Sequence, residues 1–365
     1  MAKAKKQSEE LNVNISLEET ISQLEKSFGK DFITSGETIA DSKPVIIPVS
    51  PNIDVGLGGG IPEGSWVSIS GPEKIGKSCS ALSFAAECQK PEYGSRPIFY
   101  FDIEHRLKSR DINGIKGLIK TSPHFNVIRS QKGNIYSNKD YLTMAQQFIT
   151  DIPGCVCIFD SLSAMCNAKV QEEGIGTSDY GSGNKLVAQF VDINESIVPI
   201  NKCIMVGIIH FYANSGGGPM ASATKEKVAT RWKYQSDVAL VGKWSEAWRT
   251  GKDESSKQIG QIVHWTVKHS AIGAPGAKID SYIRYGTGID KVYELMLTAQ
   301  DIGLISGTTW YTLTFMNNYP EVCKELGYAE GEEIKLQGNE KVYRFINDNP
   351  KVNEILNKEL KNILG

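Results

Sequence analysis

Hydrophobic residues between positions 61 and 290 gather in short continuous runs, each followed by a helical or turn-forming segment. Runs that are apolar at every position are typical of strands covered on both faces, as in the parallel sheet of an α/β protein. The last three runs follow one another without a helix between them, which predicts an antiparallel extension of that sheet. We therefore predict an α/β fold with a mostly parallel central sheet extended by antiparallel strands. The candidate strands are residues 66–70, 97–101, 155–159, 203–209, 238–241, 261–267 and 282–285.

A separate amphipathic helix precedes this core. Ser16 and Glu19 have the spacing of a capping box, and Gly29 has the position of a helix end. A short helix with one apolar stripe is stable only when the stripe is covered. Packing on its own domain and docking on a neighbouring subunit both satisfy this, and the spacing leaves both open. The stripe consists of Leu17, Ile21, Leu24 and Phe28.

Breaker residues and changes in pattern predict the domain boundaries. The charged segment 1–11 is expected to be a disordered lead-in, and residues 12–43 carry the amphipathic helix and a strand. Prolines and a glycine run mark the entry into a core at 44–290. Helical patterns at 291–305 and from 338 onward predict a small α-rich C-terminal domain, residues 291–365.

Composition narrows the class of protein. With 40% hydrophobic and 22% charged residues, the 365-residue chain is typical of a globular protein, without a signal peptide or membrane-spanning run. The seven cysteines lie mostly in apolar runs and lack zinc-finger spacing, which favours a cytoplasmic location. The net charge of −2 gives no global attraction to nucleic acid, so such binding requires local clusters of cations.

The octet GPEKIGKS at positions 71–78 fits the phosphate-binding loop of NTPases, and it lies between a predicted strand and a predicted helix. Backbone N–H groups of such a loop cradle phosphates at the N-terminus of the helix. Lys77 is expected to neutralise the β- and γ-phosphates, and the Ser78 hydroxyl to bind Mg²⁺. The expected ATP-binding residues here are Gly71, Pro72, Glu73, Lys74, Ile75, Gly76, Lys77, Ser78 and Cys79.

Polar residues follow three neighbouring strand candidates. Asp160 has the place of the acidic residue that holds Mg²⁺ opposite Ser78, although a strand-ending Asp can equally cap a helix. Glu104 is the candidate base for the attacking water, with Asp102 as its rival. His210 has the position of a γ-phosphate sensor, or is a satisfied histidine at a strand end.

Two long loops follow the strands. The first loop, 171–183, is rich in Gly and Ser, and the second loop, 212–233, ends in a basic stretch. Long loops in compact domains are usually functional or disordered. A basic loop that follows a strand sensing ATP is suited to contact DNA in a way that depends on the bound nucleotide. The alternative is a charged loop that is only solvated. The basic residues are Lys225, Lys227, Arg231 and Lys233.

With these motifs in place, the chain resembles the RecA family of homologous-recombination ATPases, including the phage UvsX type. The resemblance runs nearly from end to end, through QLEKSFGKDFI, GPEKIGKS, FDIEH, CIFDSLSAM and EEGIGTSDYG to the C-terminal INDNPKVNEILNKELKNIL. It implies a RecA-like ATPase core that binds ATP and Mg²⁺, with Glu104 as the catalytic glutamate. It also implies a helical homo-oligomer with ATP at the subunit interface, joined by the stripe from Leu17 to Phe28.

The same resemblance implies polymerisation on single-stranded DNA and strand exchange with homologous double-stranded DNA, in recombination and repair. Single-strand-binding and loading proteins stay open as further partners. The residues implied to contact DNA are Gly174, Ile175 and Gly176 in the first loop, and Gly217, Gly218, Met220, Ser222, Lys225, Lys227 and Arg231 in the second.

One departure concerns the two interface lysines, spaced K-x-K, that the family places at the neighbour's γ-phosphate. Lys268 fills the first position and Ser270 the second. Lys268 is therefore expected to take part in catalysis. The serine leaves two alternatives open: weaker activation across the interface, as in a weakly hydrolysing structural filament, or a share of the role for His269. Two further alternatives use the same phosphate loop: a ring-forming helicase or translocase, and a small-molecule kinase. The Lys-rich second loop does not suit the Arg-rich lid that such a kinase needs.

Overall fold

The computed structural model describes residues 17–29, 32–165, 182–213, 224–226, 228–251 and 253–364. The chain divides into two compact units, one up to Pro44 and one from Val45 onward. The first unit contains helix α1 (Leu17–Phe28), as predicted, followed by Gly29 with a φ of 94°. A second short helix, α2 (Gly36–Ala40), is capped by the Ser35 side chain, which accepts a hydrogen bond from the Thr38 N–H.

The apolar stripe of α1 lies open within this unit. Leu17 is 76% exposed, Phe28 71% and Leu24 37%. No residue of α1 is buried against the described part of its own unit. Large apolar side chains aligned on one face of a helix are stable in water only when another surface covers them.

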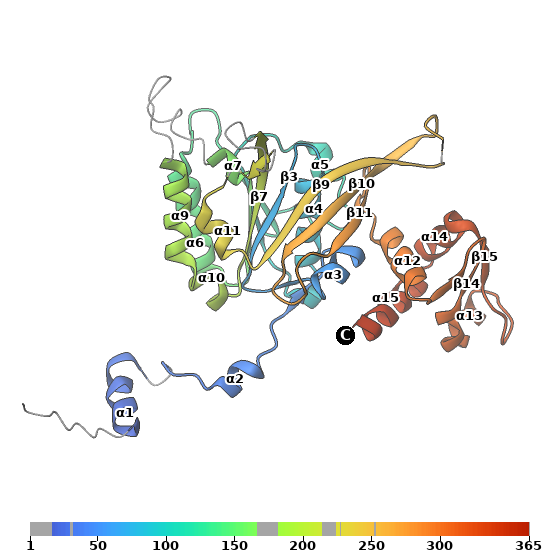
Figure 1. Ribbon diagram of the computed structural model, residues 1–365, viewed down its shortest axis with the longest axis horizontal. Coiled ribbons are helices and arrows are strands. Elements are labelled where there is room, and N and C mark those ends of the chain that lie inside the picture. Colours follow the sequence, from blue (N-terminus) through green and yellow to red (C-terminus); the bar gives the residue numbers. More distant parts are fainter. Residues whose placement is uncertain are drawn as a thin grey trace, which may run out of the picture. The chain divides into compact units, whose positions relative to one another are not determined.

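The second unit is built on a twisted sheet (Figure 1), and its fold class is as predicted. In space the strands run in the order β12-β11-β10-β9-β3-β7-β6-β4-β5, with β8 beside β7. The strands from β5 to β9 on this path pair in parallel, and β10, β11 and β12 extend them antiparallel. The bounds are β3 (Trp66–Gly71), β4 (Ile98–Asp102), β5 (Phe125–Ile128), β6 (Val156–Asp160), β7 (Ile204–Ala213), β8 (Thr224–Glu226), β9 (Val238–Arg249), β10 (Gln258–His269), β11 (Lys278–Arg284) and β12 (Gly288–Ile289).

Strands β9 and β10 are longer than their apolar runs predicted, and they form an extended ribbon (Figure 1). Residues 238–242 of β9 are buried, whereas residues 243–247 are exposed. The apolar run that predicts β9 therefore ends where neighbouring elements no longer cover the strand, while its backbone pairing with β10 continues.

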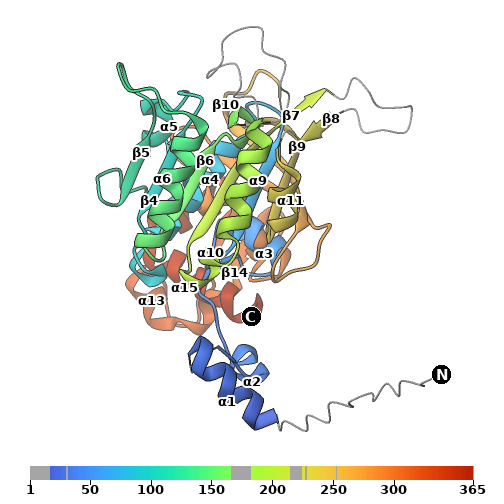
Figure 2. The same cartoon turned by 90° about the vertical axis from the view of Figure 1, so that its left-hand side faces the viewer.

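Helices cover the two faces of the sheet (Figures 1 and 2). Neighbouring residues of one strand point to opposite faces, so Ile158 packs in the cluster with α4, and Phe159 packs with α9 and α11. The main helices are α3 (Pro51–Leu57), α4 (Lys77–Cys88), α6 (Asn138–Asp151), α9 (Ser182–Asn194) and α11 (Thr230–Gln235). Shorter elements are β1 (Ile46–Ile47), β2 (Ile61–Pro62), η1 (Pro91–Tyr93), α5 (Ser109–Asn113), α7 (Leu162–Met165) and α10 (Ile197–Ile200).

The C-terminal segment has its own apolar cluster. It contains the predicted helices and also a small antiparallel sheet, in the order β13-β14-β15, that the sequence did not predict. These strands are three or four residues long, too short for an alternating pattern to stand out. The elements are α12 (Lys291–Asp301), β13 (Ile305–Gly307), β14 (Trp310–Leu313), η2 (Thr314–Asn318), α13 (Pro320–Glu325), β15 (Lys335–Gln337), α14 (Gly338–Asp348) and α15 (Pro350–Leu364).

The C-terminal segment is joined to the core through a buried glutamate. Glu294 of α12 accepts hydrogen bonds from the Ser281 hydroxyl (2.8 Å), the Tyr282 N–H (2.9 Å) and the Asn52 N–H (3.2 Å). Residues from Val45 onward accordingly form one compact unit, and the boundary at 291 stays a prediction. No helix in the described part of the chain is both long and apolar enough to cross a membrane.

Candidate nucleotide site

The phosphate loop connects the central strand β3 to helix α4. Gly71, the last residue of β3, lies beside His210 of β7 in the sheet. Gly76 precedes the helix with a φ of 110°, and a Cβ on it would lie 2.4 Å from Cδ1 of Ile283. Only glycine combines that backbone conformation with so close a neighbour. The N-terminus of α4 therefore opens directly onto the loop, where backbone N–H groups and the helix dipole favour an anion.

Lys77 is buried in this loop with an exposed fraction of 4%. Its ammonium group donates hydrogen bonds to the carbonyl oxygens of Gly71 (3.0 Å) and Pro72 (2.6 Å). Burial lowers the pKa of Lys77 to about 8, although Asp160, Glu104 and Glu73 oppose this shift. Among the described residues, no carboxylate lies within ion-pair distance of this ammonium. A buried cation held only by carbonyls fits an anionic phosphate as its missing counter-charge.

Ser78 and Asp160 meet at the same edge of the sheet. The Ser78 hydroxyl donates to Oδ2 of Asp160 at 2.7 Å, and the Tyr100 hydroxyl donates to the same oxygen at 2.5 Å. Burial raises the pKa of Asp160, while the hydrogen bonds from Tyr100 and Ser78 oppose the rise. A hydroxyl and a carboxylate oxygen are ligands that Mg²⁺ accepts. The residues present therefore fit the predicted Mg²⁺ site.

Glu104 has partners on three sides. Oε1 accepts a hydrogen bond from the Ser161 hydroxyl and lies 3.2 Å from Nε2 of His210, and Oε2 lies 3.2 Å from Nε of Arg106. The hydrogen bond with His210 lowers the pKa of Glu104 to about 2, and Ser161 and Arg106 add to this against the effect of burial. The side chain is therefore a carboxylate throughout the physiological pH range.

Asp102, the rival candidate, has different surroundings. Its side chain is 2% exposed, and Oδ1 accepts hydrogen bonds from the N–H groups of Arg106 (3.0 Å) and Leu107 (3.4 Å). Arg129 lies 3.6 Å from Oδ2. Asp102 thus holds the connection after β4, whereas Glu104 faces His210. This contrast favours Glu104 as the residue that contacts reacting groups.

Glu104, Asp160 and His210 offer ligand atoms within 4.8 Å of one another. His210 is held by its backbone, because its N–H donates to the Ser163 hydroxyl at 2.8 Å. Mg²⁺ prefers oxygen ligands, so the imidazole fits a hydrogen-bonding role toward Glu104 better than a role as a Mg²⁺ ligand.

Lys268 and Ser270 lie apart from this cluster. Lys268 of β10 has a side chain 51% exposed, and its ammonium lies 4.0 Å from Oε2 of Glu226. The Ser270 hydroxyl donates to the Leu57 carbonyl at 2.7 Å and accepts from the Gly273 N–H at 2.9 Å. Ser270 therefore stabilises the turn after β10.

The structure describes few of the residues that the sequence predicted to contact DNA. Gly174, Ile175, Gly176, Gly217, Gly218, Met220, Ser222 and Lys227 lie outside the described residues. Lys225 lies in β8, opposite Tyr212 of β7.

The second loop is also shorter than predicted. Strand β7 continues to Ala213, and helix α11 begins at Thr230. Arg231 lies on this helix, and its guanidinium forms ion pairs with Asp192 and Glu195. Its charge is thus already balanced within the subunit.

Tyr100, Ser161 and Arg106 are members of the site that the sequence did not single out. Tyr100 lies inside an apolar strand run, and Ser161 and Arg106 follow strand ends without belonging to the phosphate-loop pattern. The only sequence signal for them is their closeness to Asp160 and Glu104. The contacts of Tyr100 and Ser161 join separate strands, and Arg106 contacts Glu104 within one connection.

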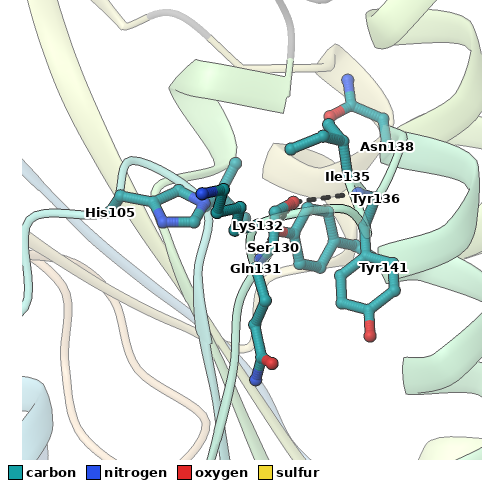
Figure 3. A pocket seen from close by; sticks show the side chains of 9 residues that line it. His105, Ser130, Gln131, Lys132, Ile135, Tyr136, Asn138 and Tyr141 are labelled. Atoms are coloured by element: carbon teal, nitrogen blue, oxygen red, sulfur yellow. Dashed lines mark hydrogen bonds between the residues drawn. The ribbon is translucent and has the colours of Figure 1, made fainter.

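A cavity of about 370 Å³ is lined by Ile103 and His105, the neighbours of Glu104 in sequence. Figure 3 shows this cavity with His105 at its edge. One wall is held by a hydrogen bond from the Tyr136 N–H to Oγ of Ser130, at 2.9 Å. No residue of the phosphate loop lines this cavity, so it is distinct from the site around Lys77. Its other lining residues are Gln131, Lys132, Ile135, Asn138 and Tyr141.

Comparison with known proteins agrees with this geometry. A family model described as the RecA N-terminal domain matches residues 15–290. A protein named Protein RecA from Thermotoga neapolitana is 28% identical over 362 residues, covering 96% of this chain and 93% of that protein. Protein RecA from Streptococcus pneumoniae is 25% identical over 407 residues, covering 100% of this chain and 98% of that protein. The chain therefore belongs to the RecA family.

Proposed function

We propose that this protein is a DNA-dependent ATPase that polymerises on single-stranded DNA and exchanges strands with homologous duplex DNA in recombination and repair. The observation that carries the proposal is the meeting of the buried Lys77, the Ser78–Asp160 pair and the ionised Glu104 at one edge of the sheet. ATP is the proposed substrate, Mg²⁺ the proposed cofactor and the cytoplasm the proposed location.

In this proposal, each residue has one task at the triphosphate. Lys77 and the backbone N–H groups of residues 71–79 other than Pro72 bind the phosphates. Ser78 and Asp160 hold Mg²⁺, which when bound neutralises charge on the phosphate oxygens. Glu104 accepts a hydrogen bond from the attacking water and orients it, and it stays ionised because its pKa is about 2. Arg106 and Ser161 hold its carboxylate in place.

His210 is the proposed link between nucleotide and DNA. It lies 3.2 Å from Glu104 on β7, the strand that leads into the second loop. A change at the γ-phosphate that alters the Glu104–His210 contact is therefore transmitted along β7. Figure 2 shows β8, the returning strand of this loop, beside β7. The first and second loops are the proposed DNA contacts.

Self-association is proposed to use two surfaces. The stripe of α1, which is uncovered within its own unit, docks on a neighbouring subunit. Lys268, which lies apart from Lys77 and Glu104, reaches the neighbour's ATP. The resulting assembly is an open helical filament, and single-strand-binding and loading proteins are its proposed further partners.

The test is ATP hydrolysis with and without single-stranded DNA, read beside negative-stain electron microscopy. The expected result is turnover stimulated by DNA, together with open filaments. Closed rings would favour the helicase alternative, and hydrolysis indifferent to DNA would contradict the proposal.

A weakly hydrolysing filament is a second candidate, favoured by Ser270. Its hydroxyl is engaged in the turn at Leu57 and Gly273, so the second interface cation of the family has no substitute at this position. Filaments with ATP turnover near background in saturating DNA would support this candidate.

A further inference from the structure

Glu226, on the returning strand of the second loop, joins three parts of the subunit. Its Oε1 accepts a hydrogen bond from the Ser70 hydroxyl at 2.8 Å, and its Oε2 lies 3.0 Å from Nζ of Lys233 and 4.0 Å from Nζ of Lys268. Ser70 directly precedes Gly71, whose carbonyl holds Lys77. One carboxylate therefore contacts the strand that leads into the phosphate loop, helix α11 and the proposed interface lysine.

The two cations hold this carboxylate unequally. The Glu226 side chain is 16% exposed, Lys233 32% and Lys268 51%. Burial opposes the charge of Glu226, but the contacts with Lys233 and Ser70 keep its pKa below the ordinary value. The contact with Lys268 is longer and more exposed, and a pair of that kind is worth at most about fivefold in an equilibrium. Lys268 can leave at little cost, and Glu226 then stays paired with Lys233.

Space around Lys268 is restricted on this side. The cavity that Glu226, Lys233 and Lys268 line with Ser68 and Ser236 has a volume of about 10 Å³. That is room for about one water and not for a phosphate group. Glu226 also places a negative charge where an incoming phosphate would bring several more. A phosphate that approaches Lys268 from this side therefore requires Glu226 to withdraw or Lys268 to turn away from it.

We propose that Glu226 is a positioning residue that ties Lys268 to the returning strand of the second loop until single-stranded DNA binds that loop. Movement of β8 on DNA binding withdraws the carboxylate and frees Lys268 for the phosphate of a neighbouring subunit. The proposal rests on the proposed function of Lys268 and of the second loop. By this mechanism DNA binding affects the subunit interface through Lys268, independently of the contact between Glu104 and His210.

The first experiment compares Glu226→Gln with the unaltered protein by ATP turnover with and without single-stranded DNA. The glutamine still accepts from Ser70 but loses the charge. We expect DNA-independent turnover to rise about two- to fivefold and DNA-saturated turnover to stay the same. Added salt should raise the DNA-independent rate of the unaltered protein and leave that of the variant nearly constant. Glu333→Gln, an exposed glutamate paired with Lys335, is the matched control for net charge. Equal falls in the DNA-independent and DNA-saturated turnover rates would overturn the proposal, because a residue that only stabilises the fold would lower both.

The second experiment needs neither hydrolysis nor assembly. Acylation of Lys268 by an amine-reactive ester, followed by mass spectrometry in dilute protein without nucleotide, reports how firmly its ammonium is held. The rate at Lys268 should be about two- to fivefold higher in Glu226→Gln. Labelling of Lys335 serves as the internal reference. An unchanged acylation rate at Lys268 would show that Glu226 does not hold Lys268. Because this result is independent of ATP turnover, it also distinguishes failure of the proposed Glu226–Lys268 interaction from failure of the proposed function.

Discussion

Nε2 of His210 lies 3.2 Å from Oε1 of Glu104, although the two residues come from strands that are not neighbours in the sheet. Glu104 follows β4 and His210 lies in β7, with β6 between them. Both side chains therefore reach across the end of β6, where Ser161 also donates to Glu104. Glu104, the candidate base, and His210, the candidate sensor, therefore contact each other across the end of the strand that carries Asp160.

Lys77→Ala should abolish ATP binding or hydrolysis, because the phosphates lose their one buried cation in the loop. Loss of a single electrostatic contact of this kind costs about 3 kcal/mol or more in the transition state. Equilibrium binding of a fluorescent ATP analogue and steady-state turnover measure the two effects. Turnover at the unaltered rate would mean that this loop is not the active site.

Glu104→Gln should retain ATP and DNA binding while hydrolysis slows strongly, so filaments should persist after ATP addition. Asp102→Asn should affect turnover less, because Asp102 holds the backbone at Arg106 and Leu107. Its effect should appear as a lower melting temperature instead. The reverse ranking of the two turnover rates would exchange the roles of these carboxylates.

Nucleotide binding should take up a proton at alkaline pH. With a pKa of about 8 in the empty site, Lys77 is mostly neutral near pH 9. Bound phosphate favours the charged form and raises that pKa, so affinity should fall as pH rises above about 8. Calorimetry near pH 9 in buffers of different ionisation enthalpy should give close to one proton taken up per site, and almost none near pH 7. Lys77→Met is the control, and uptake that persists in it would assign the proton to another group.

Replacement of Ile21 and Leu24 together by Asp should leave a folded monomer that does not form filaments. No residue of α1 is buried in the described part of its unit, so the core loses nothing. Circular dichroism and light scattering with ATP and DNA measure fold and assembly. Global unfolding would instead show that the stripe belongs to the protein's own core.

Lys225→Ala with Lys227→Ala should weaken DNA binding and flatten its salt dependence. Each phosphate contact on a single strand contributes a slope of about 0.7, so the change should be about 1.4. Arg231→Ala should change the slope less, because its guanidinium is already paired with Asp192 and Glu195. Fluorescence anisotropy over a salt series gives the slopes. A larger change for Arg231 than for the lysine pair would overturn this assignment.

Local patterns were sufficient for those parts of the fold and site whose determinants are contiguous. The helix from Leu17 to Phe28, the strand before Gly71 and the helix after Gly76 each follow from spacing, because backbone hydrogen bonding and amphipathicity act over a few residues. The strands of the C-terminal sheet escaped prediction because they are too short to show a period.

By itself, the sequence determined the phosphate loop, seven strands of the central sheet, and the candidate carboxylates at strand ends. Only the tertiary structure decided that Glu104 rather than Asp102 faces His210, and that Tyr100 donates a hydrogen bond to Asp160. It also decided that Arg231 forms ion pairs with Asp192 and Glu195. Finally, it placed Glu226 in contact with both Ser70 and Lys268. These contacts join residues between 36 and 156 positions apart, or depend on the side of a strand end from which a side chain points. Such choices are set by strand order and register, which depend on the packing of the whole sheet and leave no local pattern in the chain.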